Sequence, residues 1–97
     1  MQAKLKILLV SSEVDPFAKT GGLADVAGSL PKALARLGHD VRIIMPRYKQ
    51  IKETEYMADM PVEMDGHLET AIIKTSLLPV RGPEADIRVP VYFVDNY

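Results

Sequence analysis

The sequence contains no cysteine and no tryptophan. The absence of cysteine excludes a disulfide framework, a thiol nucleophile and a cysteine-based metal site. The two histidines, His39 and His67, lie far apart in the chain and each follows a glycine. We interpret both histidines as turn residues rather than ligands. The sequence therefore predicts neither a metal site nor a cofactor.

The chain also lacks long apolar runs and an excess of charge. No stretch reaches the roughly 18 consecutive apolar residues that a membrane-spanning helix needs. The 12 Lys and Arg residues nearly balance the 13 Asp and Glu residues, so no basic surface for nucleic acid is expected. A length of 97 residues allows one small domain. We expect a cytoplasmic protein without a membrane or nucleic-acid partner, or a plastid protein if the source is a plant.

The first half of the chain has a strand–helix–strand pattern. The apolar run from Leu5 to Val10 is typical of a parallel strand that is covered on both faces. Apolar spacings of three and four predict a helix from about Leu23 to Leu37, with a kink caused by Pro31. The predicted apolar stripe consists of Leu23, Val26, Ala27, Leu30, Leu34 and Leu37. Gly38 supplies a left-handed end, and Val41 to Met45 forms the second strand, parallel to the first.

The second half predicts an antiparallel hairpin and a final strand. Apolar residues alternate from Tyr56 to Met64, and Pro61 places this half-exposed strand at an edge. Asp65-Gly66 is a strong turn signal, so Leu68 to Leu78 returns as an antiparallel partner. The residues from Pro79 to Asp86 form a loop. The continuous apolar run from Val89 to Asn96 is predicted to rejoin the buried sheet.

These elements indicate an α/β fold that is incomplete. A parallel strand with apolar residues on both faces needs helices on both faces, but the sequence supplies one clear helix. We therefore expect residues 1–97 to be the beginning of a larger domain.

The bend after the first strand combines several features that favour an anion. It contains Lys19, Thr20, Gly21 and Gly22 and lies between the first predicted strand and helix. The helix start offers free N–H groups and the positive end of its dipole. The glycines would let a phosphate approach the backbone, and Lys19 adds a positive charge. A diphosphate site is one interpretation of this bend.

A plainer interpretation of the same residues stays open. Gly21 and Gly22 would form only a tight turn, and Lys19 would be a solvated side chain. Thr20 would then cap the helix. Known phosphate motifs do not decide between the two, because the sequence lacks both the G-x-G-x-x-G fingerprint and the P-loop pattern. The end of the second strand also lacks the acidic residue that an NAD site requires.

Two carboxylates flank the bend. Asp25 falls in the first helical turn, where it would complement the helix dipole or turn toward the hydroxyls of a bound sugar. Glu13 follows the first strand, where ligand-facing side chains are common in α/β proteins, but a solvated loop residue is equally compatible with this position. The pattern alone leaves both choices open.

The sequence closely resembles the N-terminus of bacterial glycogen synthases and plant starch synthases. The resemblance begins in the run from Lys6 to Leu34, KILLVSSEVDPFAKTGGLADVAGSLPKAL. It continues from Leu37 to Val41 and from Met45 to Tyr48, and it returns from Val91 to Asn96. The KTGGL element is highly specific in this context, and the similarity spans essentially the whole chain.

This resemblance implies a retaining glucosyltransferase of the GT-B type, in which two Rossmann-like domains face a cleft. Such enzymes move glucose from ADP-glucose to the non-reducing end of an α-1,4-glucan, without a metal ion. Residues 1–97 would form the incomplete Rossmann-like βαβ start of the N-terminal domain, with an inserted antiparallel hairpin. The C-terminal nucleotide-binding domain would lie outside this chain.

The resemblance also implies roles for the residues of the bend. Lys19 would help to bind the phosphate region of the donor, and Gly21 and Gly22 would line the same loop. Asp25 and Glu13 would lie near the donor glucose or the glucan acceptor. The catalytic residues of the family, a cleft histidine and groups of the C-terminal domain, have no counterpart in this chain.

If the chain belongs to a synthase, the fragment alone is expected to be inactive. Two further interpretations compete with the synthase interpretation. The chain could instead be a non-catalytic nucleotide or sugar-phosphate binding module, or a small structural α/β domain with an ordinary turn.

Overall fold

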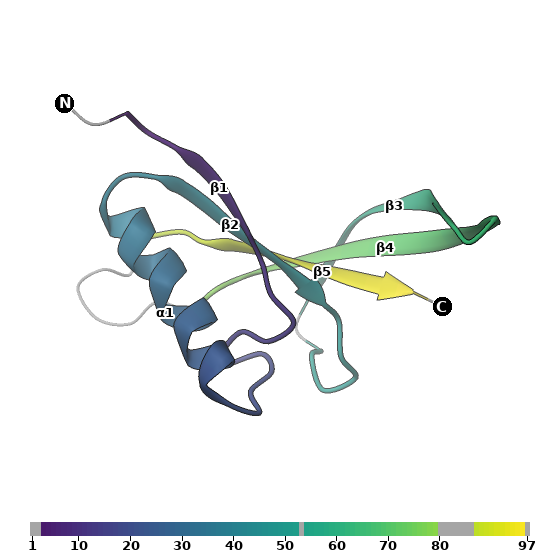
Figure 1. The fold of residues 1–97 in the computed structure, drawn as a ribbon, viewed down its shortest axis with the longest axis horizontal. Helices are drawn as coiled ribbons and strands as arrows, with labels where there is room; N and C mark the ends of the chain where they lie inside the picture. The colour runs from purple at the N-terminus through teal and green to yellow at the C-terminus, as the bar shows by residue number, and fades with distance from the viewer. Residues whose placement is uncertain (1–2, 53, 80–86, 97) are drawn as a thin grey trace.

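A computed structural model describes residues 3–52, 54–79 and 87–96. The described residues form a five-stranded sheet with a helix on one face (Figure 1). The elements in chain order are β1 (Lys6–Val10), α1 (Gly22–Arg36), β2 (Asp40–Pro46), β3 (Glu55–Met64), β4 (His67–Leu77) and β5 (Pro90–Asn96). The strand order across the sheet is β1-β2-β5-β4-β3. Within the described ranges, no helix is long and apolar enough to cross a membrane.

The parallel half of the sheet confirms the predicted βαβ unit. β1 pairs with β2 in parallel, with Val10 opposite Ile44. β5 lies on the other side of β2, also in parallel, so the last apolar run rejoins the sheet as predicted. The carboxyl ends of β1, β2 and β5 therefore meet at one edge of the sheet, where ligands bind in open α/β folds.

The antiparallel hairpin is also confirmed. Asp65 and Gly66 have φ values of 51° and 79°, as a two-residue hairpin turn requires. β3 is the edge strand, as Pro61 indicated. Its even positions are more exposed than predicted: Met60 is 46% and Met64 is 54% exposed. The reason is that the end of the hairpin extends past the rest of the sheet, away from α1, the one helix of the described residues (Figure 1).

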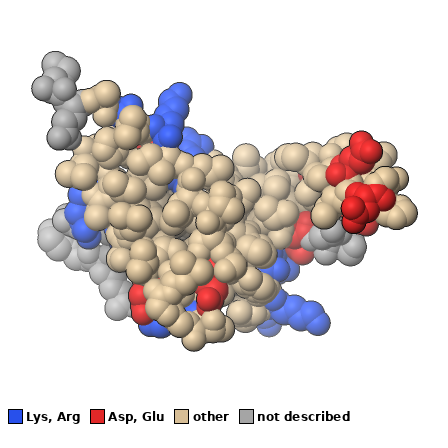
Figure 2. Space-filling view, viewed as in Figure 1, with Lys and Arg blue, Asp and Glu red and all other residues tan. Residues whose placement is uncertain are grey.

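The hairpin is acidic. Five Asp and Glu residues, and neither Lys nor Arg, occur between positions 55 and 73, and they are Glu55, Asp59, Glu63, Asp65 and Glu69. Figure 2 shows acidic side chains gathered at this end, whereas Lys and Arg lie over the body of the molecule. The negative charge of the hairpin would repel a phosphate-bearing ligand, and the Lys and Arg side chains on the body of the molecule would attract it.

The core lies between α1 and one face of the sheet. Phe93 of β5, Ile43 and Met45 of β2, and Val14 of the loop after β1 are each buried to 2% exposure or less. The ring of Phe17, in the same loop, meets the ring of Phe93 edge to face at 5.1 Å. The loop after β1 is therefore part of the core.

The packed face of α1 differs from the predicted stripe. The buried positions of the helix are Ala24, Ala27, Gly28 and Pro31. Leu23, Val26, Leu30 and Leu37 are instead 44–66% exposed. The buried face of α1 carries small residues because the loop after β1 approaches the helix too closely to leave room for leucine side chains. The helix continues through Pro31, and Gly38 ends the turn after it with φ of +94°, as predicted.

The opposite face of the sheet has no helix among the described residues. Leu8 is 56% and Val10 is 75% exposed, so the described residues do not cover β1 on both faces, in keeping with the single helix that the sequence supplies. The strand register places Ile44 and Val94 on the same face of the sheet as Val10. Side chains alternate along a strand, so a single covering helix protects only every second residue.

Candidate functional site

The loop between β1 and α1, residues 11–21, carries most of the predicted site residues. The core holds this loop from within: Val14 is fully buried, Ala18 is 8% exposed, and Phe17 packs on Phe93. The loop leaves β1 at the carboxyl edge of the sheet and leads into the N-terminus of α1. A scaffold of this kind fixes the position of the polar groups that the loop presents to solvent.

Hydrogen bonds tie the loop to three neighbouring elements. Ser11 N–H donates to Ile44 O of β2 (3.1 Å), Asp15 N–H donates to Ala24 O of α1 (3.0 Å), and the Tyr48 hydroxyl donates to Ser12 O (2.9 Å). Within the loop, Ala18 N–H donates to Val14 O at 3.0 Å. The loop thus has little freedom to change its course.

Gly28 allows the loop to rest directly on α1. A Cβ atom at this position would lie 2.8 Å from the carbonyl oxygen of Asp15. Real Cβ atoms essentially never approach backbone oxygen so closely. Glycine at position 28 is therefore a steric requirement of the observed loop position.

Lys19 and Asp25 are brought together at the start of α1. Lys19 Nζ lies 2.6 Å from Asp25 Oδ1, and both side chains are about half exposed. The hydrogen bond from Lys19 and the negative charge of Asp25 raise the pKa of Lys19 above its ordinary value. Lys19 is charged at neutral pH, as an exposed lysine is, and its ion pair with Asp25 holds the charge at the first turn of α1.

Glu13 and Thr20 form a second pair across the loop. Glu13 Oε1 accepts a hydrogen bond from Thr20 N–H at 2.5 Å and another from the Thr20 hydroxyl. The interpretation of Thr20 as a helix cap is wrong, because the N-cap is Gly21 and no side chain caps the helix. Glu13 is likewise not a freely solvated residue, since its carboxylate is held by Thr20.

The conformation of Gly21 and Gly22 does not by itself require glycine. Gly21 has φ of −166°, an extended backbone that any residue adopts, and Gly22 begins α1. A Cβ atom at either position would meet nothing within 4 Å. The alternative of a tight turn that needs glycine is therefore not supported. Both glycines border open space at the helix N-terminus, where a ligand could approach the backbone.

A hollow of about 420 Å³ opens beside these groups. Its lining comes from the loop after β1 and from the segment after β2, namely Ser12, Glu13, Ala18, Lys19, Thr20, Tyr48 and Gln50. Sequence reasoning did not assign a role to Tyr48 or Gln50, although Tyr48 follows the end of β2. Arg47 Nη1 and Asp95 Oδ2 of β5 lie 3.2 Å apart, and this ion pair holds the start of the segment that carries Tyr48 and Gln50.

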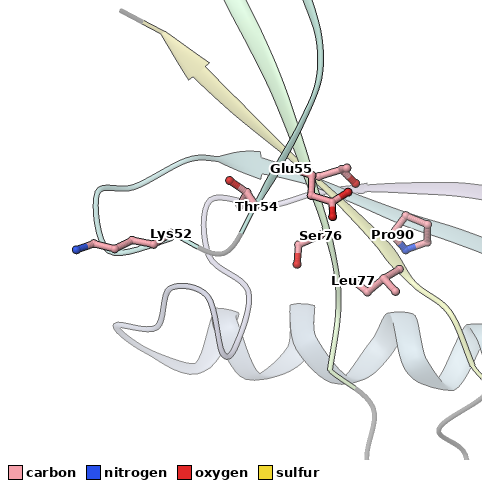
Figure 3. A pocket seen from close by; sticks show the side chains of 7 residues that line it. Lys52, Thr54, Glu55, Ser76, Leu77 and Pro90 are labelled. Atoms are coloured by element: carbon pink, nitrogen blue, oxygen red, sulfur yellow. The ribbon is translucent and has the colours of Figure 1, made fainter.

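A larger hollow, of about 790 Å³, lies at the start of β3 (Figure 3). Thr54, Glu55 and Ser76 supply polar groups there, but the side chain of Lys52 points away from them in Figure 3. Among the described residues that line this hollow there is neither a glycine nor a helix N-terminus. Among the described residues, no cluster of three His, Asp or Glu side chains could hold a metal ion. The loop after β1 is therefore the better candidate for an anion site.

Comparison with known proteins identifies the family of this chain. The family model described as "Starch synthase catalytic domain" matches residues 6–97. The chain belongs to the starch synthase catalytic domain family. The resemblance noted in the sequence is thereby confirmed.

The curated relatives that this chain matches include glycogen synthases. The glycogen synthase of Moorella thermoacetica is 63% identical over 97 residues, which are 100% of this chain and 19% of that protein. The glycogen synthase of Desulforudis audaxviator is 54% identical over 99 residues, covering 96% of this chain and 20% of its own length. This chain therefore spans about a fifth of the length of these relatives.

A solved structure supports the predicted fold. The catalytic domain of starch synthase IV from Arabidopsis thaliana, bound to ADP and acarbose, matches with a TM-score of 0.69 and 31% identity. The match covers 97% of this chain and 19% of the Arabidopsis chain. The expected α/β start of a GT-B N-terminal domain is therefore confirmed. The assignment of individual site residues stays a prediction.

Proposed function

We propose that this chain is the N-terminal part of a glycogen or starch synthase that transfers glucose from ADP-glucose to the non-reducing end of an α-1,4-glucan. The observation that carries the proposal is the anchored loop, which presents a charged Lys19 beside an open helix N-terminus. The glycogen synthase relatives and the ADP-bound Arabidopsis structure support the same assignment. By this proposal the protein acts in the cytoplasm.

In this function, the loop binds the diphosphate of the donor. When glucose transfer begins, negative charge builds up on the departing ADP. Lys19 and the free N–H groups of α1 stabilise that charge without having to reorganise, because the loop already fixes them. Residues outside this chain would supply the groups that break and form the glycosidic bonds.

Asp25 changes partner in this scheme. Its carboxylate lies 2.6 Å from Lys19 and balances the positive charge of the loop. A bound diphosphate takes over Lys19, and like charges then drive the carboxylate away from the phosphate. The hydroxyl groups of the donor sugar are the natural new donors for Asp25.

The glycine pair offers a direct test of ligand approach. In the full-length enzyme, Gly21→Ala is expected to weaken ADP-glucose binding by about 10-fold, since the added methyl group occupies space that the diphosphate needs. The free energy of unfolding should change by less than about 0.5 kcal/mol, because nothing lies within 4 Å of the new atom. Calorimetric titration and urea unfolding measure the two quantities. Unchanged affinity would remove Gly21 from the site.

A non-catalytic binding module is the second candidate function. Titration calorimetry of residues 1–97 with ADP-glucose separates it from the synthase, with circular dichroism as a check that the chain is folded. A synthase fragment holds one side of the donor, so we expect no saturation below millimolar concentrations. A dissociation constant in the micromolar range for this chain alone would favour the module.

A further inference from the structure

We propose that Glu13 is a positioning residue, which sets the phosphate-binding loop for Lys19, and that it does not bind substrate itself. The inference rests on the proposed function. Glu13 Oε1 accepts hydrogen bonds from both the backbone N–H and the hydroxyl of Thr20, seven residues further along the chain. One carboxylate oxygen thus closes the loop immediately after Lys19.

Glu13 is itself firmly fixed. The Ser11 hydroxyl donates to the carbonyl oxygen of Glu13 at 2.6 Å and accepts a hydrogen bond from Glu13 N–H at 3.3 Å. Ser11 is 8% exposed, and Tyr48 holds the carbonyl of the intervening Ser12 at 2.9 Å. The carboxylate therefore projects from an anchored backbone and acts as a stationary acceptor for Thr20.

The position of Glu13 beside Lys19 is consistent with a positioning role. Glu13 and Lys19 both line the hollow of about 420 Å³, and an uncommitted carboxylate there would repel a diphosphate. Hydrogen bonds to an ionised acceptor are stronger than neutral ones, so the two bonds from Thr20 hold the carboxylate in place. The hydrogen bonds leave the negative charge of Glu13 in place, but they give this acidic residue a role in the fold of the loop.

Loss of this contact would free the segment that carries Lys19. Thr20 is followed by Gly21 and Gly22, which restrict the backbone less than any other residues would. Without the carboxylate, the loop would have to be ordered at the moment of ligand binding, and the cost would appear as weaker donor affinity.

Three variants of the full-length enzyme test the proposal by steady-state kinetics. Glu13→Ala should raise the KM for ADP-glucose by about 10-fold and leave the KM for the glucan within about 2-fold. Glu13→Gln keeps an oxygen acceptor for Thr20 and should recover most of this loss. Thr20→Val, which removes the hydroxyl, should raise the KM for ADP-glucose by about 3-fold. Glu63→Gln, on the exposed hairpin, serves as the matched control.

The double variant decides whether Glu13 acts through Thr20. If it does, Glu13→Ala combined with Thr20→Val should be no worse than Glu13→Ala alone, because both changes remove one interaction. Multiplied losses, or a raised KM for the glucan, would overturn the positioning role and make Glu13 a substrate contact. A lower melting temperature with unchanged KM values would reduce Glu13 to a structural role and also overturn the proposal. An unmodified enzyme that fails to transfer glucose from ADP-glucose would instead overturn the proposed function.

Discussion

Replacing Lys19 with glutamine is expected to lower the turnover number of the full-length glucosyltransferase by at least about 100-fold, the usual effect of removing one group that stabilises developing charge. The Lys19 ammonium group stands at the N-terminus of α1, and glutamine cannot supply its charge. The change also leaves the Asp25 carboxylate without its partner at 2.6 Å, so this carboxylate would repel the diphosphate. Initial rates of glucose transfer at saturating ADP-glucose measure the effect.

The matched control for this variant is Lys4→Gln. Lys4 is an exposed lysine that precedes β1, at the end of the strand opposite the loop. Its replacement should leave turnover unchanged. The melting temperature of the Lys19 variant should also be unchanged, because exposed ion pairs contribute little to stability. Turnover close to that of the unmodified enzyme would show that Lys19 does not contact the donor phosphates.

The second large effect is expected at Gly28. Gly28→Ala should lower the free energy of unfolding by about 2 kcal/mol, within the usual cost of overpacking a filled site. The new methyl group would lie 2.8 Å from the carbonyl oxygen of Asp15, and backbone atoms cannot move aside as a flexible side chain would. Relief of this clash requires the loop to lift from α1. Urea denaturation of the chain, followed by circular dichroism, measures the loss.

Gly22→Ala provides the comparison for Gly28→Ala. Both glycines lie in α1, and alanine favours a helix over glycine by up to about 1 kcal/mol. Nothing lies within 4 Å of a Cβ atom at Gly22, so Gly22→Ala should preserve or raise stability. Gly28→Ala should therefore lower the free energy of unfolding, whereas Gly22→Ala should not. A Gly28→Ala variant as stable as Gly22→Ala would contradict the close approach between loop and helix.

The order of strands and helix could be predicted because it depends on local signals. The apolar run before Ser11, the helical spacing up to Gly38 and the Asp65-Gly66 turn each define an element within a few neighbouring residues. The parallel pairing then follows from the handedness of the βαβ connection. These steps need no knowledge of which side chains meet.

The packed face of α1 could not be predicted in this way. Periodicity places the largest apolar side chains inward, but the partner of the helix is a backbone segment at Asp15, and only a small residue such as Gly28 lets it approach. Two faces of the helix carry apolar residues, and the face with the smaller side chains is the buried one. The identity of the neighbour decides between them, and that neighbour is known only from the folded chain.

The candidate site shows the same limit. Lys19 and Asp25 can be recognised in the sequence because they lie on either side of the start of one helix. The contact between Glu13 and Thr20 depends on the way the intervening loop folds around Val14 and Ala18. Tyr48 reaches the loop from the segment after β2, and it lies 36 positions further along the chain than Ser12. Contacts of this kind follow from tertiary structure and have no local signature.

The packing of Phe17 against Phe93 has a consequence for the speed of donor capture. A loop that is anchored in the core has its final shape before any ligand arrives. The encounter of a diphosphate with Lys19 then needs no slow rearrangement of this segment, and its rate is set by diffusion and electrostatic attraction. In rapid-mixing experiments, the observed rate of the first binding phase should rise linearly with ligand concentration.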